Sequence, residues 1–388
     1  MAQIRVIDSL SQISASDWNR CARSACASYN PFISHEFLLA LELSGSANAK
    51  TGWKPSHLIL EVAGEIVAAA LCYVKSHSQG EYVFDHGWAD ALHRAGGQYY
   101  PKLQMSVPFT PVTGPRLLCA DATHQGLLAK AAIEFCRKAD ASSVHITFAT
   151  TTEANGLVPP QWLLREDIQF HWQNNGYDNY DAFLASLSSA KRKNLRKERN
   201  AIAGSGITFE HVTGKDIAET HWDHFFAFYM DTGSRKWGHP YLTRLFFSLI
   251  GQTMANDVLL VLAKREGRYI AGALNFIGGD TLYGRNWGCI EHHPFLHFET
   301  CYYQAQDFAI ARRLKTVEAG AQGEHKLARG YVPVKTQSLH HLAHPGLHRA
   351  VADYLKNERD AVAYNETVLS QHTPFRNDSQ GGDDSNDL

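Results

Sequence analysis

The feature that most constrains the fold is an internal repeat. Residues 64–71 read GEIVAAAL and residues 267–274 read GRYIAGAL, so a glycine-led strand pattern occurs once in each half of the chain. An apolar strand pattern precedes each copy, at 57–62 and at 258–263, and a helix and a short strand follow each copy after different intervening segments. Because the elements recur in the same order, we interpret the chain as a duplication of one unit made of a sheet and helices.

The bulk properties of the chain exclude several classes of protein. At 388 residues it is long enough for two cores, and its formal net charge of -2 gives no overall field that would attract nucleic acid or acidic membrane. No apolar run reaches the roughly 18 to 20 residues that cross a bilayer, and the first residues lack the pattern of a secretory signal. The seven cysteines are dispersed without a Cys-x-x-Cys pair, which predicts reduced thiols and a cytoplasmic location.

One segment is strongly basic although the chain as a whole is neutral. Residues 191–199 read KRKNLRKER, and on a helix the arginines at 192, 196 and 199 share one face. Such a surface suits the phosphates of a tRNA, a nucleotide-linked precursor or coenzyme A. A solvated helix face without a ligand is the alternative. The predicted phosphate-binding residues are Arg192, Lys193, Arg196 and Arg199.

Residues 258–335 form the unit around which the other predictions are arranged. In the predicted strand 281–289, alternate side chains lie on opposite faces, which groups Arg285 with Trp287. An arginine between aromatic residues can stack on them and bind an anionic group, so both residues are predicted to bind substrate. The alternative is that a helix covers this face and Arg285 extends past it to solvent.

The segment 317–331 carries the strongest local signal of a site. It follows a short strand pattern and combines glycines with acidic, basic and amide side chains, and no core pattern explains that crowding. A solvated turn is the alternative. The candidates in it are Glu318, Gln322, Glu324, His325, Lys326, Arg329 and Tyr331.

Two further groups of residues were weighed as sites. Asp85 and His86 lie within a predicted strand at 81–88 in the first half, where Asp85 could act as a base and His86 could bind substrate; a buried hydrogen-bonded pair is the alternative. His292, His293 and His297 lack an acidic or cysteine partner at ligand spacing, so we predict no metal site.

The order of strands and helices in the two halves resembles tandem GNAT domains, and several phrases resemble the FemAB-like group of GNAT-fold proteins, related to the Fem-type peptidyl transferases. The resemblance covers the chain to about residue 365. The phrases that carry it lie at 30–35, 82–90, 107–116, 144–148, 170–174, 192–199, 231–238 and 320–331.

This resemblance implies an α+β fold of tandem GNAT-like domains, with twisted mixed sheets flanked by helices. We place the first domain at 1–180, a basic helical connector at 181–206, the second domain at 207–370, and an acidic tail, expected to be disordered, at 371–388.

The resemblance also implies N-acyl transfer, in which an acyl or aminoacyl group moves onto an amine of a small molecule or peptide. In Fem-type enzymes a lysine near the last strand of the second domain is tied to the transfer step, and its nearest match here is Lys326. Glu324 or Asp85 is the predicted base, Lys326 and Arg329 would stabilise developing charge, and Tyr331 would protonate the leaving group.

The identity of the donor stays open between acyl-CoA and aminoacyl-tRNA. Neither predicted helix that follows a fourth strand is preceded by the Arg/Gln-x-x-Gly-x-Gly/Ala loop that holds the pyrophosphate in acetyl-CoA-dependent GNAT domains. An aminoacyl-tRNA, and hence a tRNA partner, is therefore at least as well supported. The alternative functions are an acetyl-CoA-dependent N-acetyltransferase and a binding module without catalysis.

Overall fold

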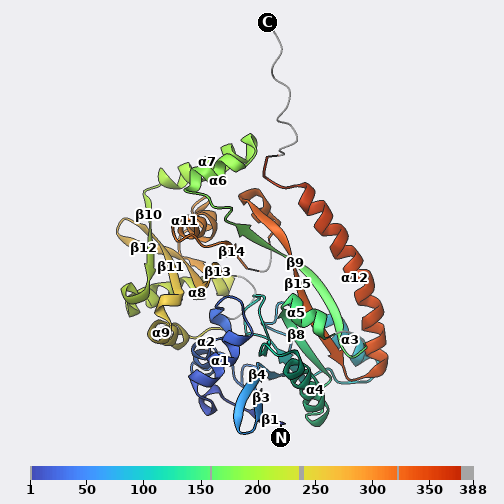
Figure 1. Ribbon diagram of the computed structural model, residues 1–388. Helices are drawn as coiled ribbons and strands as arrows, with labels where there is room; N and C mark the ends of the chain where they lie inside the picture. Colours follow the sequence, from blue (N-terminus) through green and yellow to red (C-terminus); the bar gives the residue numbers. More distant parts are fainter. Residues whose placement is uncertain (1, 158–159, 236–239, 321–322, 377–388) are drawn as a thin grey trace.

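The first half of the chain builds a mixed α/β unit. The computed structural model describes residues 2–157, 160–235, 240–320 and 323–376 (Figure 1). The first-half elements are β1 (Ala2–Ile7), α1 (Ala15–Ser24), η2 (Pro31–Ile33), α2 (His35–Leu43), β2 (Trp53–Pro55), β3 (His57–Val62), β4 (Glu65–Ala70), β5 (Tyr73–Lys75), α3 (His86–Arg94), β6 (Lys102–Met105), β7 (Leu117–Leu118), α4 (Ala122–Lys138), β8 (Ser143–Ala149), α5 (Thr151–Gly156) and β9 (Leu163–Gln173).

The second half repeats the combination of sheet and helices after two helices at its start. Its elements are α6 (Tyr180–Ser186), α7 (Ser189–Ala203), β10 (Ile207–Thr213), α8 (Glu219–Arg235), α9 (Arg244–Thr253), η4 (Ala255–Asp257), β11 (Val258–Arg265), β12 (Arg268–Gly278), β13 (Thr281–Cys289), α10 (Leu296–Phe298), η5 (a π-helix, Glu299–Tyr303), α11 (Gln304–Ala311), β14 (Thr316–Glu318), η6 (a 3-10 helix, Glu324–Arg329), β15 (Tyr331–Leu342) and α12 (Pro345–Gln371).

The two halves exchange strands and so share one sheet. Its order is β10-β11-β12-β13-β14-β9-β15-β8-β6-β5-β2, and a smaller sheet has the order β1-β3-β4-β7. Strand β9 of the first half lies between β14 and β15 of the second half, and β15 pairs on its other side with β8 of the first half. A unit boundary drawn near 180 therefore separates β9 from both of its neighbours in the sheet.

The α+β architecture with tandem GNAT-like units, predicted from the resemblance, is confirmed. The repeated segments form equivalent strands, β4 and β12, each preceded by an antiparallel partner, β3 and β11. The first six residues of β11 are all buried, as expected for a strand covered on both faces.

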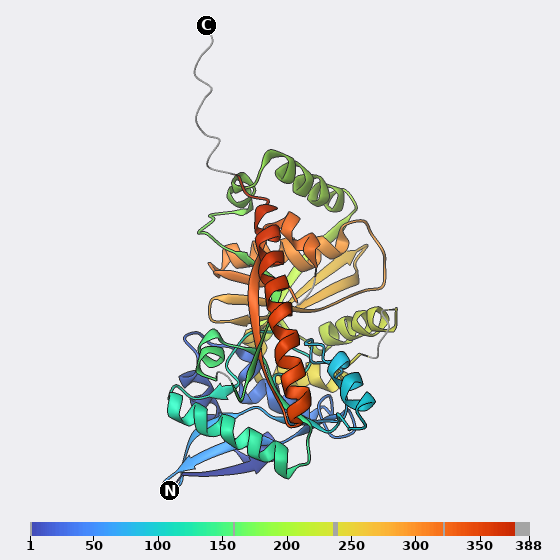
Figure 2. The same ribbon diagram turned by 90° about the vertical axis from the view of Figure 1, so that its right-hand side faces the viewer.

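Helices cover the sheet and bring the halves together. Figures 1 and 2 show α12 running along the outer side of β9 and β15, while α6 and α7 lie at the far end of the molecule from β1. Helix α8 packs so closely on β13 that a Cβ built on Gly288 would lie 2.2 Å from the backbone of Phe228. No helix among the described residues combines the length and apolar character needed to cross a membrane.

Two sequence predictions, the strand at 81–88 and the tail at 371–388, can be compared with the structure. The strand predicted at 81–88 is wrong: this stretch is a loop that leads into α3 at His86, because Glu81 and Asp85 are both drawn inward to a buried lysine. The predicted tail is described only to residue 376, where Phe375 bridges to Leu187 beside the start of α7. The remaining tail residues, 377–388, lie outside the described part.

Candidate functional site

A pocket opens beside β13 where its pairing with β14 stops. The parallel ladder between these strands spans only Thr281–Tyr283 and Thr316–Glu318. Next to it lies a pocket of about 100 Å³ between β12, β13 and the η5 helix. Its lining includes Asn275, Arg285, Trp287, His297, Cys301 and Tyr302. The predicted substrate-binding pair, Arg285 and Trp287, thus lies in one pocket.

A β-bulge positions Arg285 at this pocket. The register of β12 with β13 shifts between Leu274, which pairs with Asn286, and Asn275, which pairs with Gly284, so Arg285 is the extra residue. The simple alternation of faces expected for 281–289 is interrupted there. Bulges re-aim side chains, and here the bulge leaves Arg285 lining the pocket.

The guanidinium of Arg285 is poorly compensated. Its Nη1 atom is buried and has no hydrogen-bond partner among the described residues. Its Cζ atom lies 5.9 Å from the ring centroid of Phe32, which belongs to the first half. Burial lowers the pKa of Arg285, and the nearby Tyr82 and Glu318 oppose that effect. A buried hydrogen-bond donor without a partner destabilises the folded state, so a carbonyl oxygen or an anionic group that accepts this hydrogen bond would bind favourably.

Glu318 lies at the end of β14, close to this arginine. The side chain is nearly buried, and burial raises its pKa to about 8, although Arg285 acts in the opposite direction. The nearest titratable partner is His171 of β9, whose Nε2 lies 3.9 Å from Glu318 Oε1. Burial and Lys326 lower the pKa of His171 to about 4, so the ring is neutral near pH 7. The sequence analysis named Glu318 as a member of segment 317–331 without giving it a role. It did not identify His171, because this residue reaches Glu318 only through the pairing of β9 with β14.

Lys326 is buried close to the same residues. Its Nζ atom donates to the carbonyl of Gly320 at 2.8 Å. Burial, with a further contribution from Arg285, lowers the pKa of Lys326 to about 8. Arg285 therefore acts electrostatically on both Glu318 and Lys326, and Glu318 lies 3.9 Å from His171. Of these four residues, Arg285 is the one that lines the pocket among the described residues. Two groups with shifted pKa values near 8 are typical of catalytic sites.

The other candidates of segment 317–331 have varied surroundings. Arg329 is nearly buried, pairs with Glu198 at 2.8 Å and covers the ring of Phe298 at 3.4 Å, so its guanidinium is already occupied. His325 is exposed and its Nε2 lies 2.9 Å from the hydroxyl of the pocket residue Tyr302.

Two members of this segment cannot be placed by their side chains. Gln322 lies outside the described residues, and Glu324 lies in η6 with its side chain outside the described part. Tyr331, the first residue of β15, is fully buried, and its ring contacts that of Tyr302 at a centroid distance of 5.6 Å. Burial raises the pKa of Tyr331 well above its ordinary value.

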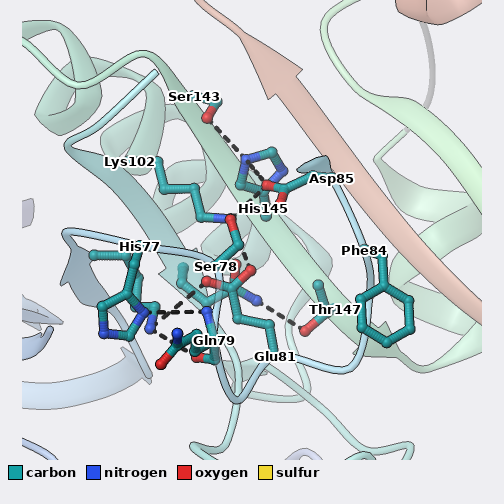
Figure 3. Close-up of polar contacts among 12 residues, drawn as sticks. His77, Ser78, Gln79, Glu81, Phe84, Asp85, Lys102, Ser143, His145 and Thr147 are labelled. Atoms are coloured by element: carbon teal, nitrogen blue, oxygen red, sulfur yellow. Dashed lines mark hydrogen bonds and ion pairs between the residues drawn. The ribbon is translucent and has the colours of Figure 1, made fainter. Parts of the chain in front are cut away.

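Asp85 lies in a separate, buried ionic cluster. Its Oδ2 atom accepts hydrogen bonds from Lys102 and, at 2.8 Å, from the hydroxyl of Tyr99, and it lies 3.8 Å from His145 Nε2. Figure 3 shows Asp85, Lys102 and His145 directed toward one another. Glu81 joins the cluster, bound to Lys102 at 2.7 Å. None of these residues lines the β13–β14 pocket.

The ionic contacts keep Asp85 charged despite burial, because Lys102 and His145 hold the pKa of this carboxyl below its ordinary value. A carboxylate held by an ammonium group and a hydroxyl is a weak proton acceptor. Asp85 is buried and hydrogen-bonded, but its partners are Lys102 and Tyr99 and not His86. His86, the first residue of α3, is exposed and stacks on Phe84.

The basic helix α7 presents one polar surface. Arg192, Lys193 and Arg196 lie on it together with Lys197 around a space of about 430 Å³. Arg199 is turned away from them toward α11: it pairs with Asp307 at 2.6 Å and Glu299 at 3.1 Å, and its Cζ atom lies 4.3 Å from the ring centroid of Tyr180. The structure therefore separates Arg199 from the other three predicted phosphate-binding residues.

Among the described residues, no group of three or more histidine, cysteine or acidic side chains is placed to hold a metal ion.

Comparison with known families decides the relationship. The family model FemAB-like, described as peptidoglycan biosynthesis/recognition, matches residues 9–377. The chain belongs to the FemAB-like family. A comparison with curated proteins gives no significant match.

Solved structures share the fold of this FemAB-like chain. FemX is 13% identical with a TM-score of 0.56, covering 88% of this chain and 98% of FemX. A conserved protein of unknown function from Bacteroides thetaiotaomicron is 11% identical with a TM-score of 0.52, over 88% of this chain and 100% of that one.

A third structure, the C-terminal domain of a putative lysylphosphatidylglycerol synthetase from Agrobacterium fabrum, is 9% identical with a TM-score of 0.50, over 88% of this chain and 96% of that one. At identities of 9 to 13%, these likenesses show a shared fold.

Proposed function

We propose that the protein is an N-acyltransferase that moves an acyl or aminoacyl group onto an amine in the pocket beside β13 and β14. The observation that carries the proposal is Arg285, which lines the pocket with an unpaired buried donor and acts electrostatically on Glu318, at the end of β14, and on Lys326. Membership of the FemAB-like family supports transfer chemistry as the reaction class.

The proposed step conserves atoms and charge. The acceptor enters as an ammonium ion and loses a proton to become a nucleophilic amine, whose nitrogen attacks the donor carbonyl carbon. The carbon–oxygen bond of an ester donor, or the carbon–sulfur bond of a thioester, breaks when the tetrahedral intermediate collapses. The leaving group takes up a proton, and the reaction releases an amide, an alcohol or thiol, and one proton.

Glu318 is our proposed base, in place of Asp85, whose carboxylate is occupied by Lys102. A carboxyl whose pKa is about 8 is deprotonated above that pH, where it can accept a proton from an ammonium ion and return it afterwards. Arg285, with its unpaired buried donor, is placed to stabilise the oxyanion of the intermediate.

Lys326 is the proposed proton donor to the leaving group, because its lowered pKa lets it act as an acid near pH 8. Trp287 would hold the acyl chain against its ring. Tyr331 and Arg329 are proposed to support this site indirectly: Tyr331 packs on the ring of Tyr302, and Arg329 packs on the ring of Phe298.

Aminoacyl-tRNA is the donor that we propose. The surface of α7 formed by Arg192, Lys193, Arg196 and Lys197 supports this, because it gathers four cations in a chain whose net charge is -2. Phosphate binding by this surface predicts affinity that falls steeply with salt.

The test supplies two donors and one amine. Purified protein is incubated with a lysine-containing peptide and either total aminoacyl-tRNA or acetyl-CoA, and mass spectrometry records the mass added to the peptide. We expect an aminoacyl mass, and small molecules that co-purify with the protein would identify its natural acceptor. If the peptide gains an acetyl mass with acetyl-CoA and no mass with aminoacyl-tRNA, the donor is acetyl-CoA and not aminoacyl-tRNA. If neither donor adds mass to the peptide or to amines that co-purify with the protein, the proposed function is overturned.

A further inference from the structure

A second pocket lies between the two halves, outside the transfer site. Its volume is about 480 Å³, which is the size of a small-molecule site. The first half contributes α1, the turn after it, η2 and the start of α2, and the second half contributes the end of α9 and η4. None of the residues that line it lines the pocket beside β13.

Two carboxylates face this pocket without a cationic partner. Glu36 accepts hydrogen bonds from the amide of Asn19 at 3.0 and 3.1 Å, and Asp257 accepts one from the hydroxyl of Tyr29 at 2.7 Å. Among the described residues, no lysine, arginine or histidine nitrogen lies within ion-pair distance of either carboxylate. Their hydrogen-bond donors are neutral, and Arg23, which also lines the pocket, offsets one of the two negative charges without pairing with either acid.

The surroundings make that charge costly. Asp257 is half-buried, and burial raises its pKa, with the negative charge of Glu36 adding to the effect. Unpaired acids in a partly desolvated cavity are stabilised by any cation that enters. The pocket also offers apolar surface, from Ile33 and Met254, which are both buried.

We propose that this pocket binds a small organic ammonium ion, whose ammonium group lies between Glu36 and Asp257 and whose apolar body packs on Ile33 and Met254. The exposed Arg23 at the same pocket adds an anchor for a carboxylate at the opposite end of the ligand. Because residues of both halves line the site, the ligand bridges them. The proposal does not depend on the transfer reaction.

The test uses three probes with the same five-carbon chain on the full-length protein: n-pentylamine, 5-aminopentanoate and pentanoate. Isothermal titration calorimetry measures their affinities. Both amines bind, 5-aminopentanoate more tightly because of Arg23, and pentanoate does not. Glu36→Gln and Asp257→Asn each weaken amine binding by roughly tenfold or more, since each removes a charged hydrogen-bond acceptor. Glu65→Gln, an exposed acid at the β3–β4 turn, leaves it unchanged.

Site-resolved alkylation keeps the proposal testable if a variant folds poorly. Cys26 lines the pocket and is half-buried, and burial raises its pKa to about 11, so iodoacetamide labelling is run at pH 9 and read by peptide mass spectrometry. The amines slow labelling of Cys26 and leave that of Cys301 unchanged. Equal binding of pentanoate, no binding of either amine, or unprotected Cys26 in the presence of bound amine would each overturn the assignment.

Discussion

Lys102→Met removes the central cation of the buried cluster in the first half. Lys102 is fully buried on β6, where it binds Glu81 at 2.7 Å and Asp85. Methionine has a similar shape but no charge, so Asp85 would retain the neutral donor Tyr99 in place of a cation, and Glu81 would retain Lys75 at 3.7 Å. Leaving one partner of a buried ion pair uncompensated costs about 3–5 kcal/mol, and we expect this loss in the free energy of unfolding.

Urea denaturation followed by tryptophan fluorescence and circular dichroism measures this change, with the slope against denaturant unchanged. Lys54→Met, at an exposed position on β2, is the matched control and should change stability by less than about 0.5 kcal/mol. Adding Asp85→Asn to Lys102→Met should restore part of the loss, because the stranded carboxylate becomes neutral. A loss below about 1 kcal/mol, or a double variant no more stable than the single one, would refute the reasoning.

Three further predictions concern other parts of the chain. Gly288→Ala should destabilise the protein by about 3 kcal/mol or more, because its Cβ meets the backbone of α8, whereas Gly126→Ala, with open space in α4, should stabilise it by up to about 1 kcal/mol in thermal or urea unfolding. Arg199→Ala should cost about 2–3 kcal/mol of unfolding free energy through its two carboxylate partners, and Arg192→Ala less than about 0.5 kcal/mol; equal losses would contradict the division of the basic residues. Burial raises the pKa of Glu318 to about 8, so the contribution of this carboxyl to stability is present below the ordinary pKa of glutamate and is lost as the pH rises toward 8. The stability of Glu318→Gln relative to the native protein should therefore increase between these two pKa values and level off above pH 8.

Local elements were largely predictable from the sequence because short-range patterns determine them. The apolar patterns at 57–62 and 258–263 correspond to β3 and β11, as expected. The repeat predicted equivalent strands, and these are β4 and β12.

Strand partners were not predictable in the same way. Nothing in the local pattern of β9 distinguishes a neighbour in its own half from one in the other half, since pairing is decided by tertiary packing. The structure was therefore needed to show that the halves exchange β9 and β15, and that His171 lies close to Glu318 as a result.

Charged residues gave the least reliable sequence signal, because burial inverts their usual interpretation. The sequence singled out the segment 317–331, in which Lys326 is buried and burial lowers its pKa to about 8. Asp85 was proposed as a base from its position alone, whereas the lysines that occupy its surroundings, Lys75 and Lys102, are fully buried and gave no pattern in the sequence. Arg199 differs from Arg192 only through the acids that face it from α11 and η5.

The most direct test of transfer at the β13–β14 pocket is the initial rate of amide formation by Glu318→Gln, compared with the native protein and with Glu166→Gln on β9 outside the pocket. Mass spectrometry of the lysine-containing peptide supplies the rate, and circular dichroism confirms folding. We predict a loss of about 100-fold or more for Glu318→Gln, as for removal of a general base, and a native rate for Glu166→Gln. A folded Glu318→Gln protein that transfers at the native rate would contradict the assignment of this carboxyl as the base.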